Sequence, residues 1–228
     1  MGKRFLIMAS ILILRCSLFL SGEKVSVEEA EKCLNNTFTD SLNDFYTPPG
    51  GAPPDGVYEF GPVDIITVSV GCDDKYLYIK FEVAENFPKG TVVSQDNNVV
   101  KKITGWCPVD IDLDPSTGCQ SDGGAEALLC FMIDLEKKET GAYFFAQPTG
   151  IEEPEEDRYA VHKDAIVVGG GSGKNWIILA YPLADIGLQK GMVVDIGFNL
   201  EAESDKWHHF SFDTCPGPTE HGKVTCQL

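Results

Sequence analysis

The chain has 228 residues, with 35 acidic against 18 basic side chains and a formal net charge of −17 at pH 7. A surface of this charge repels phosphate backbones and anionic lipids, which excludes nucleic-acid binding and membrane-surface attachment as expected roles. A chain of this length has room for one domain with a sizeable core.

The first 22 residues have the pattern of a secretory signal peptide. Lys3 and Arg4 precede an apolar run over residues 5–20, and two small residues follow. Arg15 interrupts the run, so it is shorter than the ~20 apolar residues that a membrane span needs; an uncleaved anchor is the alternative. We expect a cleaved signal and a secreted, soluble protein without membrane contact. Cleavage removes three basic residues and no acid, which changes the net charge from −17 to −20.

Residues 23–57 are expected to form an N-terminal segment outside the main domain. Ser26 and Glu29 match a capping box, which predicts a short helix. Asn35 begins a glycosylation sequon. Residues 47–56 are rich in proline and glycine, and they predict a loop or linker.

From residue 58 to residue 228 the pattern is almost entirely that of β-strands separated by turn signals. The expected strands are residues 63–70, 76–83, 109–114, 125–135, 142–147, 159–168, 175–181, 192–200 and 207–212. Residues 84–105 are polar and irregular, and we expect a long surface loop there. The pattern predicts one all-β domain over 58–228, an antiparallel β-sandwich of the immunoglobulin or jelly-roll type, preceded by the short N-terminal helix.

The strand expected at 109–114 alternates strictly between apolar and acidic residues. Strand side chains alternate between faces, so Val109, Ile111 and Leu113 would point into the core and the acids would share the other face. Carboxylates this close repel one another, and Ca²⁺ takes about six to eight oxygen ligands, so we expect a structural calcium site. The alternative is a solvated strand end. The expected ligands are Asp110, Asp112, Asp114, Asp122 and Glu126.

Seven cysteines follow the signal, and none belongs to a C-x-x-C pair, which argues against a zinc or thioredoxin-type site. Disulfides are the ordinary state of cysteines in secreted proteins. Cys130 lies within an apolar strand and is expected to be unpaired. Closeness in sequence favours the first two of the following pairs, and elimination leaves the third: Cys107–Cys119, Cys215–Cys226 and Cys33–Cys72.

The sequence offers little for catalysis and more for binding. It has neither a G-x-S-x-G nor an H-E-x-x-H motif, and we predict that it is not an enzyme. Sugar rings stack on flat aromatic faces, so Trp106, Trp207 and the neighbouring His208 are candidate ligand-binding residues, with Trp207 as the main platform. Burial of both tryptophans in the core is the alternative. Trp176 lies within an apolar run and is expected in the core.

Three segments resemble DOMON-like domains and family 9 carbohydrate-binding modules. Residues 64–83 are similar to their D-I-x-x-V-x-V … D-D-x-Y-L-Y-I-x-F opening, residues 110–126 to their D-x-D-x-x-x-x-T-G … G-A-E segment, and residues 179–188 to a later strand and turn. The resemblance implies a β-sandwich that binds a sugar or haem and often holds structural calcium. By position it implies that Asp110, Asp112, Asp114 and Glu126 lie near calcium and that Trp207 stacks on sugar.

Three functions from different classes follow. The first is a secreted, calcium-stabilised module that binds carbohydrate or a cell-surface glycan. The second is a calcium-dependent extracellular structural or filament subunit that self-associates when the proline-rich segment docks on a neighbour's sheet edge. The third is a haem-binding electron carrier of the DOMON type, whose axial ligands would be chosen from Met132, Met192, His162, His208 and His209.

Overall fold

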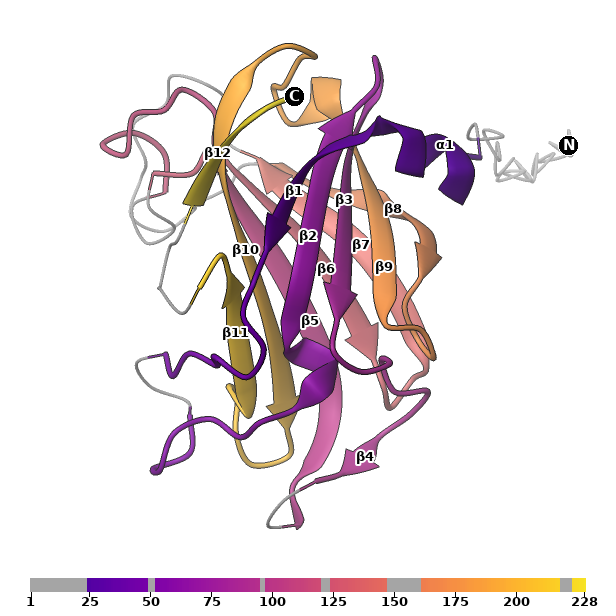
Figure 1. Cartoon of the computed structure of the whole chain (residues 1–228), viewed down its shortest axis with the longest axis vertical. Helices are drawn as coiled ribbons and strands as arrows, with labels where there is room; N and C mark the ends of the chain where they lie inside the picture. Colours follow the sequence, from indigo (N-terminus) through magenta and orange to yellow (C-terminus); the bar gives the residue numbers. More distant parts are fainter. Residues whose placement is uncertain (1–23, 49–51, 95–96, 120–123, 147–160, 218–222) are drawn as a thin grey trace, which may run out of the picture.

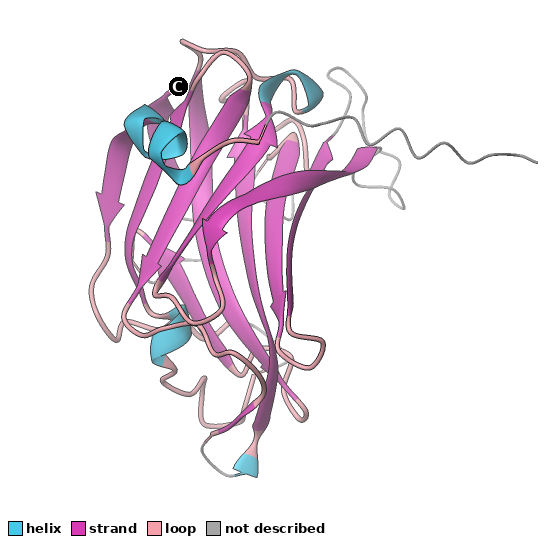
Figure 2. Cartoon of the chain, turned by 90° about the vertical axis from the view of Figure 1, so that its right-hand side faces the viewer, coloured by secondary structure: helices cyan, strands magenta, loops and turns pink. Residues whose placement is uncertain are grey.

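The structure is a computed structural model, and it describes residues 24–48, 52–94, 97–119, 124–146, 161–217 and 223–228. Its strands join into one antiparallel sheet that folds back on itself, so that two layers face each other (Figures 1 and 2). The signal peptide expected at 1–22 lies outside the described residues. In chain order the elements are α1 (Val27–Cys33), β1 (Leu34–Thr39), η1 (Gly61–Val63), β2 (Ile65–Cys72), β3 (Tyr76–Val83), β4 (Val92–Val93), β5 (Val99–Asp110), β6 (Ala127–Asp134), β7 (Glu139–Ala146), β8 (Val161–Gly170), β9 (Trp176–Pro182), η4 (Leu183–Asp185), β10 (Val193–Ser204), β11 (Ser211–Cys215) and β12 (Lys223–Gln227).

The strands follow one another across the sheet in the order β1-β2-β3-β9-β8-β7-β6-β5-β10-β11, with β4 beside β5 and β12 beside β10. β8 takes part in both layers, because its first half pairs with β7 and its second half with β9. The first layer therefore contains β1, β2, β3 and β9, and the second contains β7, β6, β5, β10 and β11. The layers also meet at a seam, where the backbone N–H of Ile65, the first residue of β2, donates to Asp213 Oδ2 of β11 at 2.6 Å.

The core lies between the layers and is built from alternate residues of each strand. In β3 these are Leu77, Ile79, Phe81 and Val83, all fully buried. Full burial of a side chain of this size stabilises the folded state by about 1.5–3 kcal/mol. The prediction of an all-β, antiparallel fold with two packed layers is confirmed.

The outer face of the first layer is partly covered by α1. The predicted capping box forms: the Ser26 backbone N–H donates to the Glu29 carboxylate, and the Glu29 N–H donates to Ser26 Oγ. Trp176 packs with the apolar residues beneath this helix, and Lys80 Nζ lies 5.9 Å from its ring centroid. Trp176, expected in the core, packs against this smaller apolar cluster and not between the layers, because its strand neighbour Ile177 takes the inward position. No helix in the described part of the chain has the length and apolar character that crossing a membrane requires.

Part of the expected N-terminal segment belongs to the sheet. β1 pairs with β2 and forms one edge of the first layer (Figure 1). Asn35, the first residue of the sequon, is exposed on this strand. Further along, the backbone N–H groups of Tyr46 and Tyr58 donate to the carbonyls of Phe212 and Phe210 at 3.0 and 2.9 Å. The residues on both sides of the proline-rich stretch are therefore packed along this chain's own second layer.

The strand that carries the candidate acids differs from the prediction at both ends. β5 begins at Val99, so residues 99–105 are strand and not loop, and it ends at Asp110. Leu113, expected in the core, is 45% exposed and has a φ of +61°. Short acidic side chains bond readily to nearby backbone N–H groups, which favours a turn over continued strand pairing. The alternation of residues 109–114 therefore persists as a strand only through Asp110.

Candidate functional site

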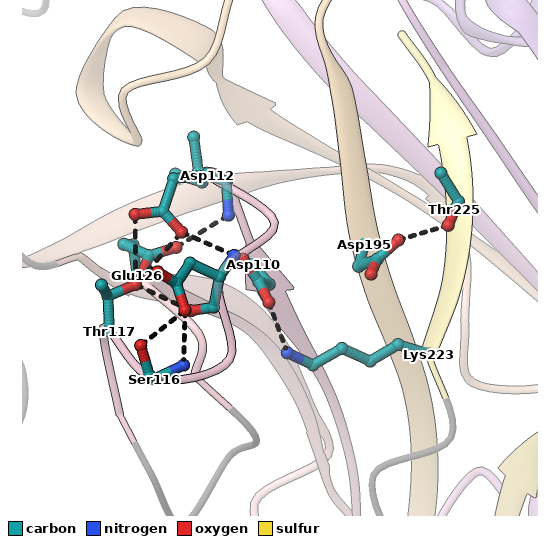
Figure 3. A network of polar contacts seen from close by, with 10 residues as sticks. Asp110, Asp112, Ser116, Thr117, Glu126, Asp195, Lys223 and Thr225 are labelled. Atoms are coloured by element: carbon teal, nitrogen blue, oxygen red, sulfur yellow. Dashed lines mark hydrogen bonds and ion pairs between the residues drawn. The ribbon is translucent and has the colours of Figure 1, made fainter.

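The first candidate site lies where β5 ends and β6 begins. The backbone N–H of Glu126 donates to Val109 O at 3.0 Å, which holds the two strand ends together. Asp110, Asp112 and Glu126 each contribute a carboxylate oxygen to one small region, and these oxygens lie within 4.8 Å of one another (Figure 3). Three of the five acids expected to bind calcium are thus brought together, in what we call the β5–β6 cluster.

Hydrogen bonding in the β5–β6 cluster leaves a surplus of acceptors. Glu126 Oε2 accepts from the Ile111 backbone N–H at 2.7 Å. The Thr117 hydroxyl lies 3.1 Å from each Asp112 carboxylate oxygen, 3.1 Å from Glu126 Oε1 and 2.8 Å from the carbonyl of Asp114. A hydroxyl carries a single proton, so it can satisfy only one of these four acceptors at a time. The crowded oxygens form an arrangement that a bound cation would stabilise.

One lysine partly offsets the charge of the β5–β6 cluster. Lys223 of β12 places its Nζ 3.5 Å from Asp110 Oδ2, and the two side chains are only 11% and 3% exposed (Figure 3). The other oxygen of Asp110, Oδ1, is buried and accepts no hydrogen bond of ordinary geometry from the described residues. Burial raises the pKa of Asp110 and of Glu126. The cluster therefore holds more negative charge than its protein surroundings stabilise.

Asp114, the fourth expected calcium ligand, is not one of the three carboxylates of this cluster. Asp114 Oδ1 accepts hydrogen bonds from the Ser116 hydroxyl at 2.6 Å and the Ser116 backbone N–H at 3.0 Å. These bonds lower the pKa of Asp114, and they close a local turn. The carboxylate of Asp114 is thus engaged within the turn that follows the end of β5 at Asp110. Asp122 lies outside the described residues.

A second group of carboxylates lies at the seam, and the sequence did not predict it. Asp40 follows β1, Asp44 lies in the next loop and Asp213 is in β11, yet one oxygen of each lies within 4.8 Å of the others. We call these three residues the seam cluster. Asp213 is fully buried, and its oxygens accept from the backbone N–H groups of Ile65 at 2.6 Å and Thr214 at 2.9 Å.

The seam cluster has no cationic partner among the described residues. Asp40 Oδ2 and Asp44 Oδ1 are buried and accept no hydrogen bond from that part of the chain. Burial raises the pKa of Asp213 to about 8, and it also raises the pKa of Asp40 and of neighbouring Asp64. A buried carboxylate is stable when it is protonated, paired with a cation or bound to a metal. The seam cluster therefore needs either protons or a cation.

Sequence reasoning missed the seam cluster because its members are far apart in the chain. The only local signal was Asp213, an acid inside a strand whose five residues are all buried. Such a position is expensive for a charged side chain and points to a partner elsewhere in the fold.

The expected ligand-binding residues lie in two different places. Trp106 is half-buried near the middle of β5, on the outer face of the second layer and opposite Asn199 of β10. Its ring centroid lies 5.3 Å from that of Phe212, and Tyr143 of β7 continues the same row across the sheet. We name this surface the aromatic face. It consists of Trp106, Tyr143, Phe145 and Phe212.

Trp207 does not belong to the aromatic face. It precedes β11, packs against the core between the layers and donates its backbone N–H to Ser204 Oγ at 2.9 Å. His208, the third expected ligand-binding residue, has 64% of its side chain exposed, and its ring centroid lies 4.6 Å from that of His209. Trp106 therefore has the outward position, and Trp207 covers the end of the core. Which of the two binds a ligand stays a prediction.

None of the three expected disulfides is present among the seven described cysteines. Cys33 is the last residue of α1 and Cys72 the last residue of β2, and their neighbours Leu34 and Gly71 pair with each other. The two cysteines are therefore near each other in the fold. Burial raises the pKa of the Cys72 thiol, and the nearby Cys33 adds to this effect.

The pairing of Cys215 with Cys226 is incompatible with the fold. Cys215 lies opposite Phe198 of β10, and Cys226 lies opposite Val194 on the same edge of that strand. Four residues of strand correspond to about 13 Å, whereas disulfide-linked Cα atoms lie about 4.4–6.8 Å apart. Closeness in sequence was misleading because β11 and β12 lie end to end along β10.

The third expected pair, Cys107 and Cys119, is also not linked. Cys107 points into the core from β5, and Cys119 is held in a separate bridge opposite Ala125. Burial raises the pKa of Cys107 well above its usual value. Its thiol is therefore held in the neutral, unreactive form.

Comparison of the chain with protein-family models, curated proteins and solved structures finds no match in any of the three. The resemblance to DOMON-like domains and family 9 modules therefore stays a prediction. Two shallow hollows on the described surface lie elsewhere, one beside α1 and one beside Lys190, and neither is lined by the residues of the carboxylate clusters or the aromatic face.

Proposed function

We propose that this protein is a secreted, non-catalytic binding module: a β-sandwich that calcium stabilises and that binds carbohydrate on its aromatic face. The observation that carries the proposal is Trp106, a half-buried indole on the outer face of the second layer, with polar side chains beside it. A structural core residue would point inward, as its strand neighbour Cys107 does.

The surroundings of Trp106 suit a sugar ring. The C–H groups of a sugar stack on an indole, and its hydroxyl groups need donors and acceptors at the rim. Asn199 lies opposite Trp106, and its Nδ2 donates to the Trp106 carbonyl at 3.2 Å, which leaves the amide oxygen to accept from a ligand. Thr104, two residues before Trp106 on the same face, is half-buried and offers a hydroxyl. The set combines one stacking surface with neutral polar groups.

The two carboxylate clusters support the calcium part of the proposal. Each places three carboxylate oxygens within 4.8 Å of one another, and oxygen-only donor sets are those that Ca²⁺ prefers. Extracellular modules bind calcium with dissociation constants of about 10⁻⁴–10⁻³ M. A secreted protein would meet enough calcium to fill such sites, which fits the predicted signal peptide.

A glycan array tests the proposal, with the wild-type protein applied in calcium and again in EDTA. For any glycan retained, calorimetry then compares Trp106→Ala with Trp106→Phe, which keeps a smaller stacking surface. Loss of a central aromatic anchor costs about 2 kcal/mol or more, so Trp106→Ala should weaken binding at least about thirtyfold and Trp106→Phe less.

Trp176→Ala is the matched control, because Trp176 is also half-buried on an outer face but lies beneath α1 on the other layer. It should keep the affinity of wild type, with melting curves showing that each variant is folded. Retention of no glycan, or equal weakening by Trp106→Ala and Trp176→Ala, would refute carbohydrate binding at this face.

A further inference from the structure

A third group of side chains differs from the carboxylate clusters in its chemistry. Glu201 lies on the outer face of β10, and His208 and His209 lie in the turn between β10 and β11. One donor atom of each lies within 4.8 Å of the others. Two imidazoles with one carboxylate are a donor set for zinc, copper or iron, whereas calcium takes oxygen ligands. We propose that these three residues bind a divalent transition-metal ion of the zinc and copper class.

The distances are close to those that such an ion requires. His209 Nδ1 lies 2.6 Å from Glu201 Oε2, and the rings of His208 and His209 are 4.6 Å apart between centroids. Bonds of about 2.0–2.1 Å in tetrahedral geometry place two ligand atoms about 3.3 Å apart. The donors therefore need to shift by no more than about 1.5 Å. His208 can supply most of this movement, because 64% of its side chain is exposed.

Two ligands of the proposed metal site, Glu201 and His209, are held in place, and the third, His208, is free to move. Glu201 is only 6% exposed, and Phe212 packs edge-on against the His209 ring with centroids 5.9 Å apart, so these two ligands have defined positions. On the open side, Glu203 Oε2 lies 3.8 Å from His208 Nδ1 and is a possible fourth ligand. The exposure of His208 also leaves room for water or a bound molecule in the coordination shell.

This site borders the aromatic face. Phe212 contacts His209 on one side and Trp106 on the other, with ring centroids 5.9 and 5.3 Å apart. A metal ion held by the two histidines would therefore lie beside Phe212 at the rim of the aromatic face. The metal site does not depend on carbohydrate binding, since its ligands all come from this chain.

Calorimetric titration of the metal-stripped protein with Zn²⁺ tests the proposal. About 10 mM Ca²⁺ in the buffer, at least tenfold above the expected dissociation constants, keeps the carboxylate clusters occupied, so that heat from Zn²⁺ reports on nitrogen-containing sites. Wild type should bind one Zn²⁺ saturably. His208→Ala and His209→Ala should each weaken binding at least about tenfold, since even outer partners of metal ligands change affinity by that factor. His162→Ala is the matched control, because His162 lies on β8 and three strands separate β8 from β10. This variant should bind Zn²⁺ as wild type does.

Electron paramagnetic resonance with Cu²⁺ identifies the ligands independently of affinity. Wild type should show hyperfine coupling to two imidazole nitrogens, and His208→Ala should show coupling to one. His208 is exposed, so this variant is expected to fold, and circular dichroism checks His209→Ala. Failure of wild type to bind Zn²⁺ saturably, equal binding by wild type and both histidine variants, or a Cu²⁺ spectrum without nitrogen coupling would each overturn the proposal.

Discussion

The β5–β6 cluster and the seam cluster each contain three carboxylates with oxygens within 4.8 Å of one another, but they differ in how the protein stabilises the charge. In the β5–β6 cluster Lys223 lies 3.5 Å from Asp110, and Asp112 is exposed to water. In the seam cluster Asp213 is fully buried, and no cation pairs with it among the described residues. Without metal, the first cluster can remain charged through its lysine and water, whereas the second must take up protons.

Because of this difference, we expect the two clusters to affect the stability of the folded state unequally. Two carboxylates at 4 Å repel by about 4 kcal/mol at an effective dielectric constant of 20, so an ionised seam cluster opposes the closure of the sheet at β2 and β11. A Ca²⁺ ion in the seam would turn this repulsion into attraction between residues from the two ends of the sheet. We therefore expect calcium to act mainly through the seam cluster.

The largest expected effect is that of calcium removal. Binding to the folded state alone stabilises it by about 3 kcal/mol at a hundredfold excess over the dissociation constant. For a chain of this size that corresponds to about 6–12 °C in melting temperature. Differential scanning fluorimetry should show this loss in EDTA, full recovery with Ca²⁺ and less with Mg²⁺. Identical melting in EDTA and in Ca²⁺ would mean that neither cluster binds the ion.

The next effect is a dependence on pH in EDTA. The folded protein keeps the Asp213 proton up to a pKa of about 8, whereas the unfolded chain loses it near 3.8. The folded state therefore binds more protons between these values, and stability falls as the pH rises through this window. The slope is up to about 1.4 kcal/mol per pH unit, or about 2 kcal/mol from pH 6 to 7.5. Urea unfolding at several pH values measures it.

Saturating calcium should remove this dependence, because the carboxylate of Asp213 is then ionised in the folded protein as it is in the unfolded chain, and Asp213→Asn should remove the slope in EDTA. If wild type in EDTA loses no stability from pH 6 to 7.5, Asp213 is ionised in the folded state.

A smaller effect separates the two clusters directly. Asp213→Asn and Asp110→Asn keep the shape of the side chain and remove one ligand charge from the seam cluster and the β5–β6 cluster, respectively. Calcium raises the free energy of unfolding, and weaker binding makes this gain smaller. We expect the gain to fall by about 2 kcal/mol in Asp213→Asn and by about 1 kcal/mol in Asp110→Asn. The gain in melting temperature on adding calcium measures both. A larger loss in Asp110→Asn would reverse the assignment.

The local sequence pattern predicted the strands well where side chains alternate between the buried face and the solvent-exposed face of the sheet. The bounds expected for β3 agree with the structure, because Tyr76–Val83 carries apolar residues at every inward position. The start of β5 was missed because Lys101 and Lys102 lie side by side. The ladder between β10 and β5 shifts register at this point, so the pair interrupts the alternation without ending the strand.

The candidate sites were likewise predictable only where their residues are close in the sequence. Asp110, Asp112 and Glu126 are close in sequence, and a local pattern was enough to group them. Asp40 and Asp213 meet only because the sheet nearly closes on itself, and no local pattern contains that information. The roles of the tryptophans depend on which face each occupies, and the sequence around them contains apolar residues on both sides.

The smallest expected effect concerns Lys223, the cation that distinguishes the two clusters. Its contact with Asp110 is 3.5 Å long, beyond ordinary hydrogen-bond length, so Lys223→Met should cost only about 1 kcal/mol in EDTA. In calcium the cost should vanish for two reasons. The ion neutralises the same carboxylates, and in the Lys223→Met variant no ammonium group competes with the ion for them. Lys190→Met is the matched control, since Lys190 also lies 3.5 Å from an acid, Asp74, but on the exposed surface. It should have the same small effect with and without calcium. If Lys223→Met costs equally in EDTA and in calcium, the ion does not bind at the β5–β6 cluster, and the stabilisation by calcium belongs to the seam alone.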